Sequence, residues 1–219
     1  MIKLSKRLET LASFIEDNSY VCDVGCDHAH LPIYLCEERK NIQVIASDIN
    51  PNPLKIAKDN IKKYHLENKI KVVERNGIEN LESKVDTVVI AGMGGILISD
   101  IISKKENLVN VKNLILSPNN EWEKVRESLN KINYEIIEEK IILENKKTYL
   151  ILKAIPSSKK NNIYFGKLKK NDLMVLYYYT DLLTKNNNIL KKIPKRHIIE
   201  RIKIKRENKR IKKFLNQKS

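Results

Sequence analysis

The run Asp23-Val-Gly-Cys-Asp-His-Ala29, just after a short apolar stretch, is the first group of residues that could do chemistry. A glycine directly after a strand lets the backbone approach a ligand and turns the chain into a helix whose N-terminus favours negative groups. The fingerprints G-x-G-x-x-G and G-x-x-x-x-G-K-[ST] are missing here, which argues against NAD and ATP. We expect a nucleoside with an amino-acid tail, its ammonium group bound by Asp23. A plain strand-to-helix turn is the alternative.

Two more polar motifs follow the next two apolar stretches. Asp48 stands 25 residues after Asp23, and an acid at the end of the second strand of such a sheet accepts hydrogen bonds from ribose hydroxyls. Capping of the next helix is its alternative role. Asn76-Gly77 offers a short amide to the edge of adenine, or forms a turn. Together the three motifs are better explained by a site for S-adenosylmethionine than by three loops without a common ligand.

The fourth and fifth apolar stretches are followed by motifs that suit a flat methyl acceptor. Three glycines in Ala91-Gly-Met-Gly-Gly95 leave room for a ligand beside the backbone. In Ser117-Pro-Asn-Asn120, the amides of Asn119 and Asn120 can present donors and acceptors to a base. The first turn of a helix starting at Glu121 is the alternative reading.

These motifs need a scaffold in which short strands alternate with amphipathic helices, and the pattern through residue 155 predicts one. We expect strands at Tyr20–Val24, Ile42–Ser47, Ile70–Glu74, Val85–Ile90 and Leu114–Leu116, then an antiparallel pair at Tyr134–Leu143 and Thr148–Ile155. We expect helices at Lys3–Phe14, Ala29–Glu38, Pro51–His65, after Gly95, and at Glu121–Ile132. The fold class is therefore α/β, a Rossmann-like, seven-stranded, mostly parallel sheet, and seven strands that end in a hairpin resemble the methyltransferase variant of that sheet. In such sheets ligands bind at the carboxyl ends of the strands.

The chain divides into two expected domains, 1–155 and 156–219, with a linker at 156–162. Beyond it, Leu173, Leu176, Thr180, Leu183, Asn187 and Leu190 recur at helical spacing. A second helix is expected at about Lys195–Leu215, which predicts an antiparallel, coiled-coil-like hairpin.

The net charge of +15 belongs entirely to the second domain. Residues 1–155 hold 23 basic and 23 acidic side chains, whereas residues 156–219 hold 19 and 4. A compositional bias would act on both parts alike, so this asymmetry indicates a polyanion as partner, and we expect RNA.

Four strings resemble the bacterial tRNA (adenine-22-N1)-methyltransferases. They are Lys3–Ala12, Asp23-Val-Gly-Cys-Asp-His-Ala-His-Leu-Pro32, Ile90-Ala-Gly-Met-Gly-Gly95 and Ser117-Pro-Asn119. The resemblance spans the chain, although the C-terminal half matches in character only. It implies a class I methyltransferase fold, S-adenosylmethionine as cofactor and methylation of N1 of adenine 22 in tRNA. Two positions depart from the family: Arg75-Asn76-Gly77 replaces Gly-Asp-Gly, and Ser117 replaces glutamine.

On these grounds we assign the site residues. The cofactor-binding set is Asp23, Gly25, Cys26, His28, Asp48, Ile49, Asn76, Gly77, Ala91, Gly92 and Met93. The catalytic candidates are Asp27, the acid of the first motif left over from cofactor binding, and Asn119. A helix cap is the rival role for Asp27. The substrate-binding candidates are Asn120, Lys195, Arg196, Arg201, Lys205 and Arg206.

Other classes of protein fit the sequence less well. Asp27-His28-Ala-His30 lacks a third firm metal ligand, so we expect no metal site. The sequence has no apolar run long enough to span a membrane and no secretory signal at its start, and three clustered cysteines favour reduced thiols in a cytoplasm. We expect a cytoplasmic monomer. The alternatives are a methyltransferase for another structured RNA, and a non-catalytic RNA-binding module on a Rossmann scaffold.

Overall fold

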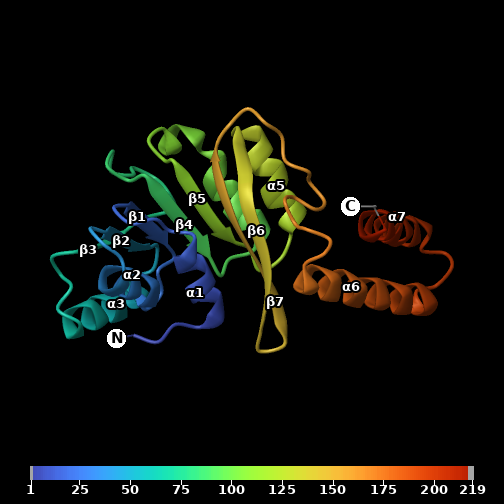
Figure 1. Ribbon diagram of the computed structural model, residues 1–219, viewed down its shortest axis with the longest axis horizontal. Helices are drawn as coiled ribbons and strands as arrows, with labels where there is room; N and C mark the ends of the chain where they lie inside the picture. The colour runs from blue at the N-terminus through green and yellow to red at the C-terminus, as the bar shows by residue number, and fades with distance from the viewer. Residues whose placement is uncertain (1, 217–219) are drawn as a thin grey trace. The chain divides into compact units, whose positions relative to one another are not determined.

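The computed structural model describes residues 2–216, and its centre is one seven-stranded sheet (Figure 1). The strand order is β3-β2-β1-β4-β5-β7-β6. The strands are β1 Tyr20–Val24, β2 Gln43–Asp48, β3 Ile70–Glu74, β4 Thr87–Ala91, β5 Asn113–Ser117, β6 Tyr134–Glu144 and β7 Lys147–Pro156. The first five run parallel, and β7 pairs antiparallel with both β5 and β6. The predicted Rossmann-like methyltransferase sheet is confirmed.

Helices cover both faces of this sheet, because the central strands are apolar on both faces. The helices that follow the parallel strands are α2 His30–Glu38, α3 Pro51–Lys63, α4 Gly95–Ser103 and α5 Trp122–Lys131; α1 Lys6–Ser13 precedes them, and a 3₁₀ helix η1 Lys105–Leu108 comes after α4. Helices α1, α2 and α3 share one core cluster with alternate strand residues, while α4 packs against α5. The sequence reading did not predict η1.

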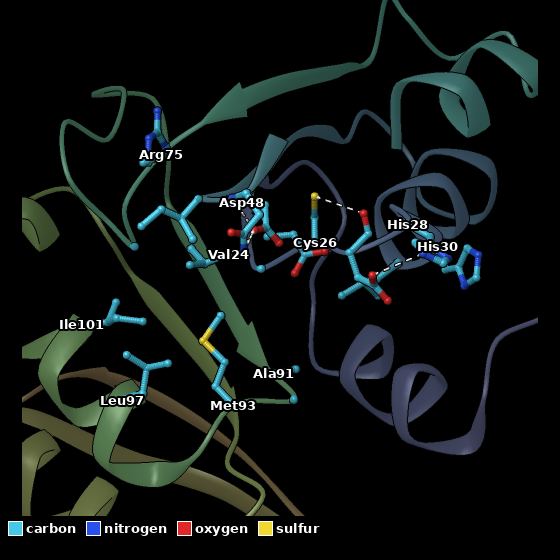
Figure 2. A pocket seen from close by; sticks show the side chains of 18 of the residues that line it. Val24, Cys26, His28, His30, Asp48, Arg75, Ala91, Met93, Leu97 and Ile101 are labelled. Atoms are coloured by element: carbon cyan, nitrogen blue, oxygen red, sulfur yellow. Dashed lines mark hydrogen bonds and ion pairs between the residues drawn. The ribbon is translucent and has the colours of Figure 1, made fainter. Parts of the chain in front are cut away.

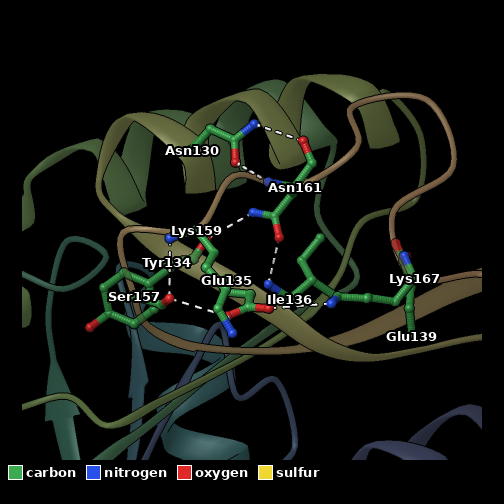
Figure 3. Close-up of polar contacts among 9 residues, drawn as sticks. All are labelled: Asn130, Tyr134, Glu135, Ile136, Glu139, Ser157, Lys159, Asn161 and Lys167. Atoms are coloured by element: carbon green, nitrogen blue, oxygen red, sulfur yellow. Dashed lines mark hydrogen bonds and ion pairs between the residues drawn. The ribbon is translucent and has the colours of Figure 1, made fainter.

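The segment expected as a linker is partly built into the sheet domain (Figure 3). Asn161 is only 8% exposed. Its side chain accepts the Ile136 N–H at 2.7 Å and donates to the Tyr134 carbonyl at 2.8 Å. The buried carboxylate of Glu139 accepts the Lys167 N–H at 2.7 Å. The first compact unit therefore runs from Met1 to Lys167, and not to Ile155.

The second compact unit, Leu168–Ser219, is a hairpin of two helices, α6 Leu173–Lys192 and α7 Ile198–Leu215. The predicted contact stripe on α6 is wrong in phase, since Leu173 is 81% exposed and the buried residues are Val175, Tyr179 and Asn186. Asn186 donates to Asn208 Oδ1 at 2.9 Å across the hairpin. A pair of polar side chains thus lies inside the contact between the two helices, where each needs the other as its hydrogen-bond partner.

No helix within residues 2–216 combines the length and the apolar character that crossing a membrane requires.

Candidate active site

A cavity of about 580 Å³ opens at the carboxyl ends of β1 to β4 (Figure 2). Its wall contains every residue that we assigned to the cofactor: Asp23, Gly25, Cys26, His28, Asp48, Ile49, Asn76, Gly77, Ala91, Gly92 and Met93. Asp27 also lines it. Residues far apart in the sequence meet here because parallel strands end at one edge of the sheet.

The turn after β1 is shaped by Gly25, whose φ is +75°. The carbonyl of Ser47 on β2 accepts the N–H groups of Gly25 at 2.8 Å and Cys26 at 3.0 Å. A Cβ at position 25 would overlap the terminal methyl group of Met93. Only glycine therefore gives this turn without strain and leaves the cavity floor open.

Two side chains of opposite charge, Asp23 and Arg7, lie in the same wall. Asp23 is 6% exposed, and burial raises the pKa of its carboxyl to about 7, with Asp48 adding to the rise and the Arg7 guanidinium opposing it. Arg7 Nη1 is buried and has no hydrogen-bond partner among the described residues. Unsatisfied buried donors are uncommon in folded proteins. This pair of unmatched charges suits a ligand that carries both an ammonium and a carboxylate.

Sequence reasoning assigned no role to Arg7, which reaches the cavity from α1. The guanidinium lies 5.4 Å from the centre of the Tyr149 ring, which supports it from β7. The sequence did contain a sign of a role for this residue: Lys6 and Arg7 begin a helix, and the positive end of a helix disfavours cations. The other lining residues that the sequence assignment omitted are Leu8, Val24, His30, Leu31, Asn50, Arg75, Leu97 and Ile101.

The polar side chains at the ends of β2 and β3 differ in how many of their atoms are already hydrogen-bonded or ion-paired. Asp48 Oδ1 accepts the Asn50 N–H at 2.9 Å, so part of this carboxylate holds the turn before α3. Arg75 is held by a 2.7 Å ion pair with Glu82. Asn76 Nδ2 donates to Glu79 Oε1 at 3.1 Å, which leaves the Asn76 amide oxygen available to a ligand.

Apolar side chains complete the wall of the cavity. Ile49 and Leu97 line the cavity and are 57% and 51% exposed. Figure 2 shows Leu97 and Ile101 on α4, with Met93 next to them. Covering these exposed apolar side chains with a flat ring removes apolar surface from water and so stabilises the bound ligand.

Asn119 and Asn120 do not line the cavity but fix the loop that does. Asn119 Nδ2 donates to the Gly92 carbonyl at 2.7 Å, and its N–H donates to the Met93 carbonyl at 2.9 Å. Asn120 Oδ1 accepts the N–H of Gly95, the first residue of α4, at 3.0 Å. Asn120 thus satisfies a helix N-terminus with its amide oxygen.

Asp27 projects at the cavity rim, with a side chain that is 78% exposed and 3.4 Å from His28 Nε2. The backbone is left-handed at Asp27, with φ of 50°. The N-cap residue of α2 is Ala29, and no side chain caps that helix. The helix-cap alternative for Asp27 is therefore wrong.

The cysteines and histidines form no metal site in the part of the chain that the structure describes. Cys22, Cys26 and Cys36 are buried free thiols, and residues 2–216 contain no group of three metal-ligating side chains placed to hold an ion.

The cations assigned to RNA binding lie in the helical hairpin. Of these, Lys195, Arg196, Lys205 and Arg206 are exposed. Arg201 differs, because its Nη1 donates to the carbonyls of Leu190 and Ile193, both at 2.9 Å, and so closes the end of α6.

Comparison with known proteins identifies the group to which these features belong. The methyltransferase domain family matches residues 4–152. A Bacillus subtilis tRNA (adenine(22)-N(1))-methyltransferase is 39% identical over 155 residues, which are 70% of this chain and 65% of that protein. The matched region is thus less than two thirds of that relative.

Two solved structures extend the likeness over almost the whole chain. Streptococcus pneumoniae Sp1610, described as a putative tRNA (m1A22) methyltransferase and solved in complex with S-adenosyl-L-methionine, is 32% identical, covers 98% of this chain and 100% of its own, and has a TM-score of 0.87. Mycoplasma capricolum TrmK with S-adenosyl-homocysteine is 28% identical, covers 97% and 98%, and also has a TM-score of 0.87. The chain belongs to the tRNA (adenine-22-N1)-methyltransferase family. The resemblance drawn from the sequence motifs is confirmed.

Proposed function

We propose that this protein transfers a methyl group from S-adenosylmethionine to N1 of adenine 22 in tRNA. The observation that supports this best is the cavity at the strand ends. Its wall brings together the buried acid Asp23, Arg7 with its unsatisfied Nη1, the acid Asp48 at the end of the second strand, and exposed apolar side chains. When bound, S-adenosylmethionine supplies an electrophilic methyl group on a sulfonium.

The cavity wall fits this cofactor by chemistry. Asp23 would bind the ammonium of the amino-acid tail and Arg7 its carboxylate, because each lacks a close partner and they have opposite charge. The free oxygen of Asp48 would accept from the ribose hydroxyls, and the Asn76 oxygen would accept from the adenine amino group. Ile49 and Leu97 would cover the faces of the base.

The acceptor side needs positioning more than proton transfer. Adenine N1 carries an in-plane lone pair, so it can attack without prior deprotonation, and the methylated base is positively charged. Asn119 holds the Gly92–Met93 backbone in place beside the cavity. Asp27, exposed at the rim, would accept from the adenine amino group or offset the developing charge.

The helical hairpin would supply most of the affinity for RNA. Lys195, Arg196, Lys205 and Arg206 are exposed cations in the part of the chain that holds the whole net charge. We therefore assign cofactor binding and chemistry to residues 1–167 and RNA binding to the helical hairpin, residues 168–219. We picture a monomer acting in the cytoplasm, where its three thiols stay reduced.

The test is methylation of an unmodified tRNA transcript with labelled cofactor, followed by mapping of the product nucleoside. We expect 1-methyladenosine at position 22 and no label in a transcript that carries guanine there. Asp48→Ala should bind S-adenosylhomocysteine about 10- to 150-fold more weakly, the cost of one good charged hydrogen bond. Asp59→Ala, an exposed acid on α3, is the matched control. Label at another nucleotide would contradict the proposed acceptor, and no label at all would contradict the proposed activity.

A further inference from the structure

The hairpin of β6 and β7 continues past the edge of the sheet at which the cavity opens. β7 pairs with β5 from Leu152 to Ala154, whereas its pairing with β6 continues to Glu144 and Lys147. Since β7 runs antiparallel to β5, its first residues lie beyond the carboxyl end of β5. Figure 1 shows this two-stranded arm reaching past the other strands.

Helix α1 fixes the arm beside the cavity. The Arg7 N–H donates to Glu144 Oε1 at 3.1 Å, and the Arg7 guanidinium lies 5.4 Å from the Tyr149 ring centre. Lys140 lies over the Phe14 ring at 4.8 Å. Because Arg7 also lines the cavity, the tip of the arm is held against the same wall.

The tip and the start of α1 together present free cations. Lys6, Lys146 and Lys147 are exposed, and none has an ion-pair partner within residues 2–216. Glu144, which pairs with Lys147 across the two strands, accepts the Arg7 N–H, and Glu9 on α1 is exposed. Lys6 opens α1, where a positive charge opposes the helix dipole, so helix stability does not account for it. Residues 1–155 have no net charge, so this concentration of cations is local.

We propose that Lys6, Lys146 and Lys147 form a phosphate-binding surface that holds the RNA next to the cavity, an inference that rests on the proposed function. An adenine that enters the cavity brings its flanking phosphates to the rim, where these ammonium groups stand. Lysines contact phosphates without reading sequence, so this surface positions the substrate rather than selects it. It adds to the cations of the helical hairpin.

The test compares two double variants that each remove two exposed lysines. Lys146→Asn with Lys147→Gln neutralises the tip, and asparagine tolerates the left-handed backbone at position 146, where φ is 62°. Lys62→Gln with Lys63→Gln, at the exposed end of α3 near the opposite edge of the sheet, is the matched control. The probe is unmodified tRNA transcript, with binding measured over a range of salt concentrations.

We expect the tip variant to bind tRNA about three- to tenfold more weakly at moderate salt. The slope of the logarithm of its binding constant against the logarithm of salt concentration should be shallower by about 1.5, the effect of losing two phosphate contacts. The control variant should match the wild type, and both variants should bind S-adenosylhomocysteine normally. Unchanged affinity and slope in the tip variant, with a wild type that binds and methylates tRNA, would overturn this surface alone. A wild type that neither binds nor methylates tRNA would overturn the proposed function, and the surface with it.

Discussion

Among single residues, Asp23 has the most unusual environment, because its carboxyl is buried and shares a wall with Arg7, whose buried Nη1 has no hydrogen-bond partner among the described residues. The sequence identified Asp23 and Asp48, since acids after strands are visible in one dimension. It assigned no role to Arg7, whose function depends on where α1 packs and on the support of Tyr149 from β7. A contact between segments so distant in the chain leaves no local pattern.

The raised pKa of Asp23, about 7 against an ordinary 3.8, makes cofactor affinity depend on pH. Below pH 7 the free protein holds Asp23 protonated, and an ammonium group favours the carboxylate, so binding must release a proton. We expect S-adenosylhomocysteine to bind about tenfold more weakly at pH 6 than at pH 8. Calorimetry in buffers of different ionisation enthalpy measures both the affinity and the proton. Asp23→Asn should bind weakly at every pH, and a flat profile in the wild type would contradict the assignment.

The raised pKa of Asp23 affects folding stability in the opposite direction to ligand binding: stability falls as pH rises. Because the folded state binds the proton more tightly than the unfolded state, the contribution of Asp23 to stability is fully present below about pH 4. It is lost as pH rises through about 7 in the absence of ligand.

Asp27 tests the acceptor side of the cavity. Asp27→Asn removes the charge but keeps the size of the side chain, and asparagine, like aspartate, tolerates the left-handed backbone conformation at this position. We expect normal cofactor affinity, an unchanged melting temperature and a kcat about tenfold lower, a modest value because the side chain is exposed and screened by solvent. Glu38→Gln, at the other end of α2, is the control. A kcat equal to that of the wild type would remove Asp27 from the mechanism.

On the scale of elements, the strands were predictable and the connections less so. Each parallel strand has five or six residues and contains at least two of Val, Ile and Leu, and the alternation of these strands with helices makes them recognisable. The seam of the helical hairpin was predicted out of phase, because Leu173 and Leu176 give α6 a second apolar stripe. Only the partner helix, through Asn208 opposite Asn186, selects the buried stripe.

Asn120 shows how an element can depend on a residue outside it. Its amide oxygen accepts the N–H of Gly95, where α4 begins. Asn120→Ala should lower the free energy of unfolding by about 1 kcal/mol, and Asn120→Asp should restore it, as urea denaturation can measure. Asn130, on the neighbouring α5, is unsuitable as a control because its side chain anchors Asn161. If Asn120→Ala instead lost kcat/KM at unchanged stability, Asn120 would contact the base, as first expected from the sequence.

For the whole molecule, the boundary between the two parts decides how they can be separated. The charge asymmetry and the polar segment that begins at Pro156 suggested a cut after Ile155, since composition changes there. Composition does not reveal that Asn161 satisfies two backbone groups of β6, or that Arg126 Nη1 donates to the carbonyls of Ile163 and Tyr164. These bonds tie residues 156–167 to the sheet and to α5, and Figure 3 shows those of Asn161.

Two shortened chains therefore distinguish folding from RNA binding. A chain ending at Ile155 leaves the Ile136 N–H, the Tyr134 carbonyl and the Arg126–Glu139 pair without several of their partners, so we expect its melting temperature to fall by many degrees. A chain ending at Lys167 keeps these bonds, and we expect it to bind S-adenosylhomocysteine like the full chain. Without the cations of α6 and α7 it should methylate tRNA at a small fraction of the full rate, with a KM too high to saturate. Methylation at the full-length rate by the chain ending at Lys167 would show that the helical hairpin is not the main RNA-binding part.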